Sequence, residues 1–341
     1  MAGSASCSAP TRPRKSAWSG SCRCAASDST RKLAPGNGSI PLRIAVVYNP
    51  VAGRGAGRQA AARLAAVAAS RGDRIDLLGT GRTMDARTAA RKAAESGAER
   101  VIAIGGDGTV VEAAAGLLAV PEPPPLAIVP QGTANLLALN LGVPHDRESA
   151  IRTAFSGGVG WIDCGRANGE PFLIAVGAGV HADVIARADR SSKRRWGVAA
   201  YGIAGWQATR GITPARFAVQ IDGEEFEIEA TTVQVMNVAS VIRRGWDFAR
   251  GVSPIDGILD VVAHRASTLA EQIVTAAAVV RGAPTATDLV VHRRGSRVRI
   301  DVDPPVTVQR DGEVAGRTPV EIDVLPRALP VVLPEGSPWT S

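Results

Sequence analysis

The chain has 341 residues, of which 45% are hydrophobic and 4% aromatic, and it carries a formal net charge of +7. This length suffices for one large domain or two ordinary domains around a core of mainly aliphatic side chains. The charge is uneven, because residues 1–40 hold six basic residues against the single acid Asp28, which leaves +2 for the other 301 residues. The basic character therefore belongs mostly to the N-terminal segment and does not predict nucleic-acid binding.

Residues 1–40 are rich in serine, arginine, glycine and proline, and we expect a disordered basic leader. The segment lacks the apolar core of a secretory signal. Its three cysteines, Cys7, Cys22 and Cys24, have no paired CxxC spacing, and the rest of the chain has only Cys164, so no disulfide framework is expected. No stretch approaches the roughly 18 apolar residues of a spanning helix. We expect a cytoplasmic protein that contacts the inner face of the membrane at most peripherally.

From residue 41 to about residue 145, short apolar segments alternate four times with helical segments. The predicted strands lie in "LRIAVVYNP", "RIDLLGT", "RVIAIGG" and "LAIVPQG", and each precedes an alanine- or leucine-rich helix. The strands are apolar throughout, which indicates burial on both faces and therefore a parallel sheet covered by helices. The sequence predicts an α/β nucleotide-binding domain over residues 41–145.

After residue 145 the pattern changes to alternating apolar and polar residues with turn pairs, as in "PARFAVQIDGEEFEIEA" and "RVRIDVDPPVTVQRDGEV". This alternation is typical of antiparallel hairpins with one solvated face. We expect a β-rich domain over residues 146–321, interrupted by one helical region at about 182–209. The segment at about 322–336 is a candidate to return to the first domain.

Four loops follow the predicted parallel strands: "NPVAGRGAG", "GTGRT", "GGDGTV" and "PQGTAN". Ligands of such sheets bind outside the carboxyl ends of the strands, where glycine allows close approach and helix starts offer free N–H groups to anions. Gly105, Gly106 and Gly108 are expected to cradle phosphate oxygens. Asp107 would then face a cation or a sugar hydroxyl, because a carboxylate repels phosphate.

Two other nucleotide motifs fit less well. Gly53, Gly55 and Gly57 follow a strand, and Asp76 lies about 20 residues further on, as in a dinucleotide-binding unit. Their spacing departs from GxGxxG, however, and such a unit needs no second phosphate loop. The GxxxxGK[ST] motif of P-loop enzymes is absent from the sequence.

The motif set resembles the diacylglycerol kinase catalytic family, which includes bacterial lipid kinases and the sphingosine and ceramide kinases. The resemblance spans about residues 42–335 and rests on Asn49–Pro50 with Gly53, "GGDGT" at 105–109 with Glu112, "PQGTANLLA" at 130–138, "SPIDGILDVV" at 253–262 and "DGE" at 311–313. It implies an NAD kinase/diacylglycerol kinase-like fold, with an α/β nucleotide domain and a C-terminal β-sandwich. It also implies ATP-dependent phosphoryl transfer to a lipid hydroxyl, with diacylglycerol as the first candidate acceptor and phosphatidic acid as product.

Carried over residue by residue, the resemblance assigns three groups of site residues. Glu313 would be the general base, with Asp107 as the second catalytic residue. Mg²⁺ would be held by Ser253, Asp256 and the backbone carbonyl of Ile258, which agrees with its preference for hard oxygen ligands. The ATP contacts would be Asn49, Pro50, Val51, Ala52, Gly53, Thr80, Gly105, Gly106, Asp107, Gly108, Thr109, Val110, Val111, Glu112 and Thr133.

Some features leave alternatives open. The phrase "VQIDGE" at 219–224 nearly repeats "VQRDGE" at 308–313, so Glu224 and Glu313 are equal candidates on chemistry, and only the family pattern favours Glu313. Three positions depart from that pattern: His181 stands where an acid is common, Val111 where an asparagine is common, and Arg310 precedes the last DGE. His181 is a candidate for a changed acceptor pocket.

The stretch "RADRSSKRRWGVAAYGIAGWQATR", which begins at Arg187, combines clustered cations with Trp196, Tyr201 and Trp206. Such a mixture suits an anionic membrane surface, although a solvated helix face with core tryptophans fits it too.

The alternatives to a lipid kinase are a NAD kinase-like phosphotransferase and a non-catalytic nucleotide-sensing module that binds membranes. The motifs of the second domain and the presence of Asp107, Asp256 and Glu313 weigh against both. A homodimer is left open.

Overall fold

The computed structural model describes residues 41–180, 182–183, 213–239, 246–283 and 287–339. The leader, His181, the basic–aromatic stretch and nearly all of the expected helical region at 182–209 lie outside the described residues. None of the described helices is long and apolar enough to span a membrane.

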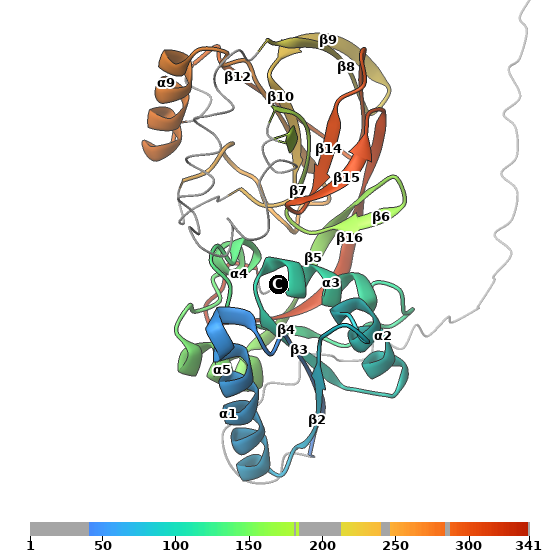
Figure 1. Ribbon diagram of the computed structural model, residues 1–341, viewed down its shortest axis with the longest axis vertical. Helices are drawn as coiled ribbons and strands as arrows, with labels where there is room; N and C mark the ends of the chain where they lie inside the picture. Colours follow the sequence, from blue (N-terminus) through green and yellow to red (C-terminus); the bar gives the residue numbers. More distant parts are fainter. Residues whose placement is uncertain (1–40, 181, 184–212, 240–245, 284–286, 340–341) are drawn as a thin grey trace, which may run out of the picture. The chain divides into compact units, whose positions relative to one another are not determined.

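The first part of the chain forms the expected parallel sheet (Figure 1). Its strands are β1 (Arg43–Tyr48), β2 (Arg74–Gly79), β3 (Arg100–Gly105) and β4 (Leu126–Pro130), in the order β2-β1-β3-β4 and all parallel. Every residue of β3 and β4 is buried, which explains why these strands are apolar throughout. The predicted α/β fold of this region is confirmed.

Helices connect and cover these strands. They are η1 (Ala52–Gly55), α1 (Ala56–Arg71), α2 (Ala86–Glu95), α3 (Asp107–Leu117), α4 (Leu136–Leu141) and α5 (Arg147–Ser156). α1 buries Ala60, Ala61, Leu64 and Ala68, a helical spacing of small residues that lets the helix lie close to the sheet.

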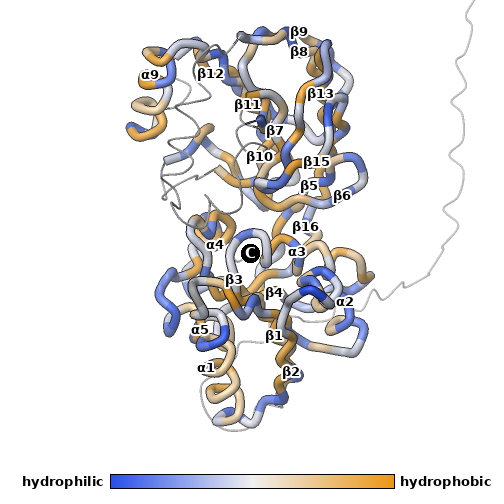
Figure 2. Tube along the Cα trace, in the orientation of Figure 1, coloured by the Kyte–Doolittle hydropathy of each residue, from blue (hydrophilic) through white to orange (hydrophobic). Residues whose placement is uncertain are grey.

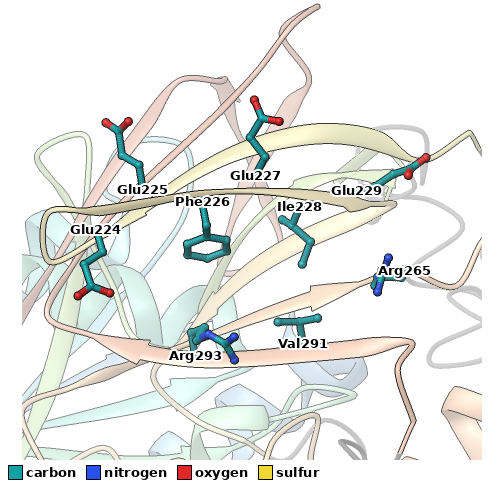
Figure 3. Close-up of a pocket in the computed structure, with 9 residues that line it drawn as sticks. All are labelled: Glu224, Glu225, Phe226, Glu227, Ile228, Glu229, Arg265, Val291 and Arg293. Atoms are coloured by element: carbon teal, nitrogen blue, oxygen red, sulfur yellow. The ribbon is translucent and has the colours of Figure 1, made fainter.

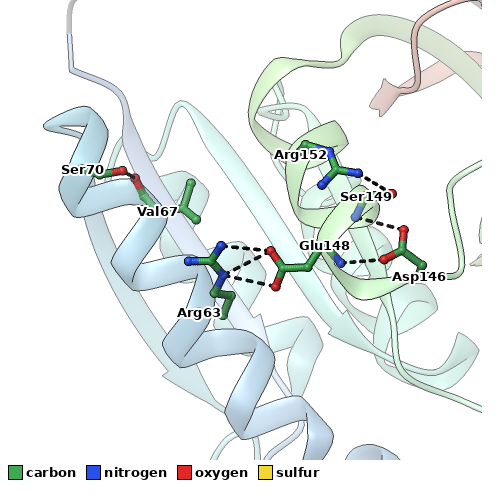
Figure 4. Close-up of polar contacts among 7 residues, drawn as sticks. All are labelled: Arg63, Val67, Ser70, Asp146, Glu148, Ser149 and Arg152. Carbon is green, nitrogen blue, oxygen red and sulfur yellow. Dashed lines mark hydrogen bonds and ion pairs between the residues drawn. The ribbon is translucent and has the colours of Figure 1, made fainter.

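Side-chain caps fix two helix starts. The Asp85 carboxylate accepts the Thr88 N–H at 2.7 Å, and Asp146 accepts the N–H groups of Glu148 and Ser149. Figure 4 shows Arg63 of α1 in a forked pair with Glu148 of α5, with a shortest N–O distance of 3.0 Å. Both side chains are about half exposed, so solvent screens this pair and it contributes little to stability.

The second part of the chain is built from antiparallel strands in two sheets. One set extends the first sheet beyond β4: β5 (Gly158–Ala167), β6 (Glu170–Phe172), β8 (Ala215–Ile221), β9 (Glu224–Ala230), β13 (Arg297–Val302) and β16 (Val320–Leu333). The other sheet has the order β12 (Val290–Gly295), β11 (Leu259–His264), β10 (Thr232–Met236), β7 (Ala175–Gly179), β14 (Thr307–Arg310) and β15 (Glu313–Arg317). Helix α9 (Leu269–Val280) connects β11 to β12. The predicted β-rich, sandwich-like architecture of this region is confirmed.

The long strand β16 contacts both parts. Its first half pairs antiparallel with β13, and near its end Val331 pairs in parallel with Leu126 of β4. Between Leu325 and Leu329 its register with β5 shifts, and Arg327 there has a φ of 47°. The two hydrophobic cores are separate, one around the parallel sheet and one between the antiparallel sheets, where Phe172 and Phe217 are fully buried. The domain boundaries proposed from the sequence remain predictions.

Candidate active site

The four loops named from the sequence lie at one edge of the parallel sheet. Backbone hydrogen bonds connect their starts: the Asn49 N–H donates to the Ile104 carbonyl at 3.0 Å, and the Gln131 N–H donates to the Gly105 carbonyl at 2.8 Å. The Thr80 N–H donates to the Tyr48 carbonyl at 2.8 Å. The structure therefore brings together chain segments from four different strand ends, as the parallel order requires.

Glycine is needed where two of these loops meet. A Cβ atom on Gly132 would lie 2.5 Å from the Gly106 Cα and 2.7 Å from the Asn135 Oδ1 atom. Gly53 has a φ of +56°, and a Cβ atom there would lie 3.2 Å from the Gln131 carbonyl oxygen. The glycines thus allow close backbone approach between the loops at the start of α3.

Asp107 connects the GGDGT loop to the PQGTAN loop. It is the first residue of α3, and its carboxylate accepts the Leu137 N–H in the first turn of α4 at 3.2 Å. Burial raises the pKa of Asp107, while the backbone N–H groups of residues 135–137 act in the opposite direction. The side chain therefore holds the start of α4 against the start of α3, a positioning contact that the sequence did not reveal.

Asn135 stabilises the PQGTAN loop through hydrogen bonds within that loop. It has a left-handed φ of 50°, and its side-chain amide accepts the Gly132 N–H at 2.8 Å and donates to the Gly132 carbonyl at 2.9 Å. An asparagine tolerates this backbone conformation better than most residues. The loop contacts thus explain the asparagine of PQGTAN, which the sequence analysis quoted without assigning it a role.

The remaining predicted nucleotide residues differ in how far they are available to a ligand. Gly108 and Thr133 are exposed, and Val51 is 76% exposed. The Asn49 Oδ1 atom accepts the Val51 N–H at 3.1 Å, and the Glu112 carboxylate accepts the Ala86 N–H at 3.2 Å, which directs Glu112 to the start of α2. Gly105 and Val110 are buried, and the rest are half-buried in the same loops or helix starts: Pro50, Ala52, Thr80, Thr109 and Val111.

An open cavity of about 580 Å³ lies beside these loops. Gly53, Gln131, Gly132 and Thr133 line it together with residues 145–148. His145 and Arg147 add basic side chains that the sequence analysis did not include, and the Arg147 Nη1 atom reaches Gln59 Oε1 at 3.4 Å. A cationic group beside glycine-rich loops suits a phosphate ligand.

A second cavity, of about 500 Å³, lies between β9 and β12. In Figure 3, Phe226 and Ile228 point toward Val291 and Arg293, while Glu225 and Glu227 point away. Among the described residues, its lining mixes glutamates with Arg265 and Arg293, and it contains no glycine-rich loop and no helix start that would offer free N–H groups to phosphate. This cavity is therefore a poor candidate for the nucleotide.

The structure distinguishes the two DGE hairpins. Asp311 and Asp222 both adopt left-handed φ angles before a glycine, as the turn type demands. The Asp311 carboxylate accepts three backbone N–H groups, from Leu173, Ile174 and Ala175, at 2.8 to 3.0 Å. Asp222 instead accepts from Ser296 and Arg297.

The residues that donate to the Asp311 carboxylate lie beside the hydrophobic core of the first part of the chain. Leu173 belongs to that core, and Glu170 nearby pairs with Arg87 of α2 at 2.7 Å. Arg310, one residue before the turn, lies 3.9 Å from the same Glu170 carboxylate. Glu313 itself is exposed, and within the described residues its carboxylate makes no hydrogen bond or ion pair. Of the two candidate bases, Glu313 is the one in a hairpin that is hydrogen-bonded to a residue of the core around the parallel sheet.

The predicted magnesium ligands lie in the loop before β11, where an arginine already occupies the carboxylate. Arg294 donates through Nη2 to Asp256 Oδ2, and its Nε atom donates to the buried Asp260 at 3.2 Å. The other Asp256 oxygen accepts the Ile258 N–H at 3.2 Å. Both oxygens are therefore engaged, and Ser253, Asp256 and Ile258 as arranged do not fit a directly bound Mg²⁺ ion. That assignment remains a prediction that would require Arg294 to move.

Asp163 fixes this loop and was missed from the sequence. Its side chain is fully buried, and it accepts the Gly257 N–H at 2.6 Å and the Arg327 N–H at 2.7 Å. It thus holds the SPIDG loop against the interruption in β16. An aspartate inside an otherwise apolar strand segment, "WIDCG", was the available signal.

Comparison with known proteins agrees with this geometry. Residues 43–167 match the diacylglycerol kinase catalytic domain, and residues 174–333 match the YegS C-terminal NAD kinase beta sandwich-like domain. A Synechocystis protein is 35% identical over 241 residues, and the match covers 69% of this chain but only 54% of that protein.

Two relatives match over almost their whole length. The diacylglycerol kinase of Bacillus subtilis is 30% identical over 295 residues, covering 86% of this chain and 97% of that protein. The diacylglycerol kinase of Mycobacterium tuberculosis is 30% identical over 300 residues, covering 86% and 95%.

Solved structures show the same fold. A crystal structure of a diacylglycerol kinase from Bacillus anthracis has a TM-score of 0.68 at 23% identity and covers 88% of this chain and 100% of that chain. Another solved structure from that organism reaches a TM-score of 0.76 at 25% identity, covering 89% and 100%. The extent of these matches, together with the loops described above, shows that the chain belongs to the diacylglycerol kinase family and is a lipid kinase that uses ATP.

Proposed function

We propose that the protein transfers the γ-phosphate of ATP to the free hydroxyl of diacylglycerol, giving phosphatidic acid and ADP, at the surface of a membrane. The observation that supports this most directly is the close backbone approach of Gly106 and Gly132, which joins two glycine-rich loops at the N-terminal end of α3. The curated relatives named diacylglycerol kinase supply the acceptor class.

In this proposal the glycine-rich loops bind the polyphosphate, Arg147 adds positive charge beside it, and the His145 ring is a further polar group of the same cavity. Phosphoryl transfer depends mainly on positioning and charge neutralisation, so a preorganised backbone cradle is the principal contribution of the protein. Asp107 keeps the starts of α3 and α4 in register through its contact with Leu137. The nucleotide would enter as its Mg²⁺ complex, and the ion neutralises phosphate charge.

Glu313 acts on the acceptor. Its exposed carboxylate takes the proton of the lipid hydroxyl, the hydroxyl oxygen forms the bond to the γ-phosphorus, and the bond to the bridging oxygen of ADP breaks. The Asp311 contacts with residues 173–175 hold the Glu313 hairpin in place.

The test compares Glu313→Gln with Glu224→Gln in the near-duplicate hairpin. Phosphorylation of a short-chain diacylglycerol by labelled ATP should fall by about 100-fold or more in Glu313→Gln, the scale of a lost general base. Calorimetric ATP affinity should be unchanged in both variants, and Glu224→Gln should keep wild-type turnover.

Three results would contradict the proposal. If Glu224→Gln is inactive while Glu313→Gln is active, the base lies in the other hairpin. Transfer to NAD rather than to lipid would indicate a NAD kinase-like enzyme. ATP binding without transfer to any component of a lipid extract would indicate a nucleotide-sensing module.

A further inference from the structure

Helix α9 exposes an apolar face and buries a more polar one. Its inward residues recur at helical spacing and include Glu271, Thr275, Ala278 and Val279. Its exposed large side chains are Leu269 (51% exposed), Ile273 (61%), Val274 (48%) and Val280 (50%), with the small exposed residues Ala270 and Ala276 between them. The tube in Figure 2 draws α9 largely in hydrophobic colours.

This concentration is specific to α9. Of the eight large hydrophobic side chains exposed in the described residues, four lie on this 12-residue helix. Singly exposed apolar residues are ordinary on a protein surface, but a contiguous apolar face usually contacts something.

Glu271, the only acidic residue of α9, does not lie on the exposed apolar face. The Glu271 carboxylate accepts the N–H groups of Ser267 at 2.8 Å and Thr268 at 3.0 Å, forming a capping box with Thr268. These backbone N–H bonds lower the pKa of Glu271 to about 2, so the carboxylate is ionised and already satisfied. The outward face therefore carries no charged side chain along its length.

Cations flank the face. Arg281 is exposed at the C-terminal end of the helix. Arg250 is exposed as well, and its Nε atom donates to the Gly282 carbonyl at 2.7 Å, which holds this arginine beside the helix end. An apolar strip flanked by arginines matches the interface of a bilayer that contains anionic lipids, where acyl chains lie below phosphate groups. In a pair of copies packed through this face, the arginines of both copies would flank one apolar interface, and α9 offers no free acid to pair with them.

We propose that α9 is a membrane-docking helix, whose face of Leu269, Ile273, Val274 and Val280 enters the boundary between headgroups and acyl chains. Arg250 and Arg281 contact the phosphates of anionic lipids around it. The proposal concerns binding to the bilayer, and it holds whichever lipid alcohol accepts the phosphate.

The experiment measures binding of the full chain to vesicles of phosphatidylcholine mixed with phosphatidylglycerol. The triple variant Leu269→Gln, Ile273→Gln and Val280→Gln keeps good helix formers and removes three exposed apolar side chains. We expect its vesicle affinity to fall by about tenfold or more, because each glutamine buries less apolar surface in the bilayer than the side chain it replaces. Its melting temperature should be close to that of the wild type. Leu77→Gln, which changes a 45% exposed leucine on β2, is the matched control and should bind as the wild type does.

Two further measurements complete the test. Arg281→Gln should weaken binding to the mixed vesicles but not to pure phosphatidylcholine, and added salt should have the same effect. Turnover of a soluble short-chain lipid should be unchanged in the triple variant, which separates this surface from the catalytic proposal. Unchanged vesicle affinity in the triple variant would overturn the inference. A dimer in gel filtration that the triple variant makes monomeric would also overturn it, since the face would then be a contact between copies.

Discussion

Replacement of Gly132 by alanine tests the contact that we place at the centre of the nucleotide site. The added Cβ atom would lie 2.5 Å from the Gly106 Cα, about 1 Å closer than two carbon atoms normally approach. Neither atom belongs to a flexible side chain, so one of the two loops must move. Overpacking of this kind costs about 1–3 kcal/mol. We expect a melting temperature lower by about 2–6 °C and turnover lower by about 100-fold, the scale of a displacement of about 1 Å in a phosphoryl-transfer site.

Two other glycines make the experiment specific. Nothing lies within 4 Å of a Cβ atom built on Gly81 or on Gly108. Gly81→Ala should leave stability and ATP affinity unchanged. Gly108→Ala lies in the first turn of α3 and should keep or raise the melting temperature, yet weaken ATP binding if phosphate approaches its N–H. Differential scanning fluorimetry, ATP calorimetry and a lipid phosphorylation assay would be run on all three variants. Wild-type ATP affinity and turnover in Gly132→Ala would refute the reasoning.

Asp107→Asn retains an acceptor oxygen for the Leu137 N–H, so near-normal melting is expected. Turnover should fall by about 100-fold, because the substitution removes the negative charge that the sequence analysis expects to face the cation of the nucleotide complex; full activity would leave Asp107 with its positioning contact alone. Arg294→Met leaves Asp256 without its arginine and leaves the His292 ring, 2.6 Å away, as the side-chain partner of buried Asp260. We expect destabilisation by about 2 kcal/mol or more, part of it restored by added Mg²⁺. The prediction would be contradicted if Mg²⁺ also raised the melting temperature of the wild type in the absence of ATP. Burial raises the folded-state pKa of Asp311 to about 6, so the folded state takes up a proton before the unfolded state as the pH falls. The free energy of unfolding of the wild type, relative to Asp311→Asn, should therefore increase by up to about 3 kcal/mol between pH 7 and pH 4. Urea titrations at several pH values would measure this difference in the free energy of unfolding. A difference that decreases as the pH falls would contradict the prediction.

The sequence predicted the fold class, and it located the four loops that the structure brings to one sheet edge, because both depend on local pattern. Continuous apolar strands such as Val101–Gly105 require burial on both faces, and the parallel order then places their following loops at one edge. The same argument located the DGE hairpins, since Asp–Gly pairs adopt the backbone angles of a tight turn.

Contacts between distant residues could not be predicted in this way. Asp107 is 30 positions from Leu137, and Asp163 is 94 positions from Gly257, so no local pattern joins them. The pairing of Arg294 with Asp256 depends on the register of β11 against β12, in which Asp260 lies directly opposite Arg294. No local pattern predicts this register, and for that reason the family-derived magnesium ligands included no competing cation. His181 and the basic–aromatic stretch lie outside the described residues and stay predictions.

The pairing of β16 with β4 has a consequence for how the chain folds during synthesis. The outer edge of β4 is paired at Leu126 only after Val331 has been synthesised, 205 residues later in the chain. Until then β4 presents an open hydrogen-bonding edge next to a fully buried, apolar strand sequence, a template for incorrect strand pairing. The α/β region is therefore not completed when its own residues have left the ribosome, as a separate N-terminal domain would be. Its final folding step awaits nearly the entire second half of the protein, and a nascent chain stalled before residue 320 should expose this edge to chaperones.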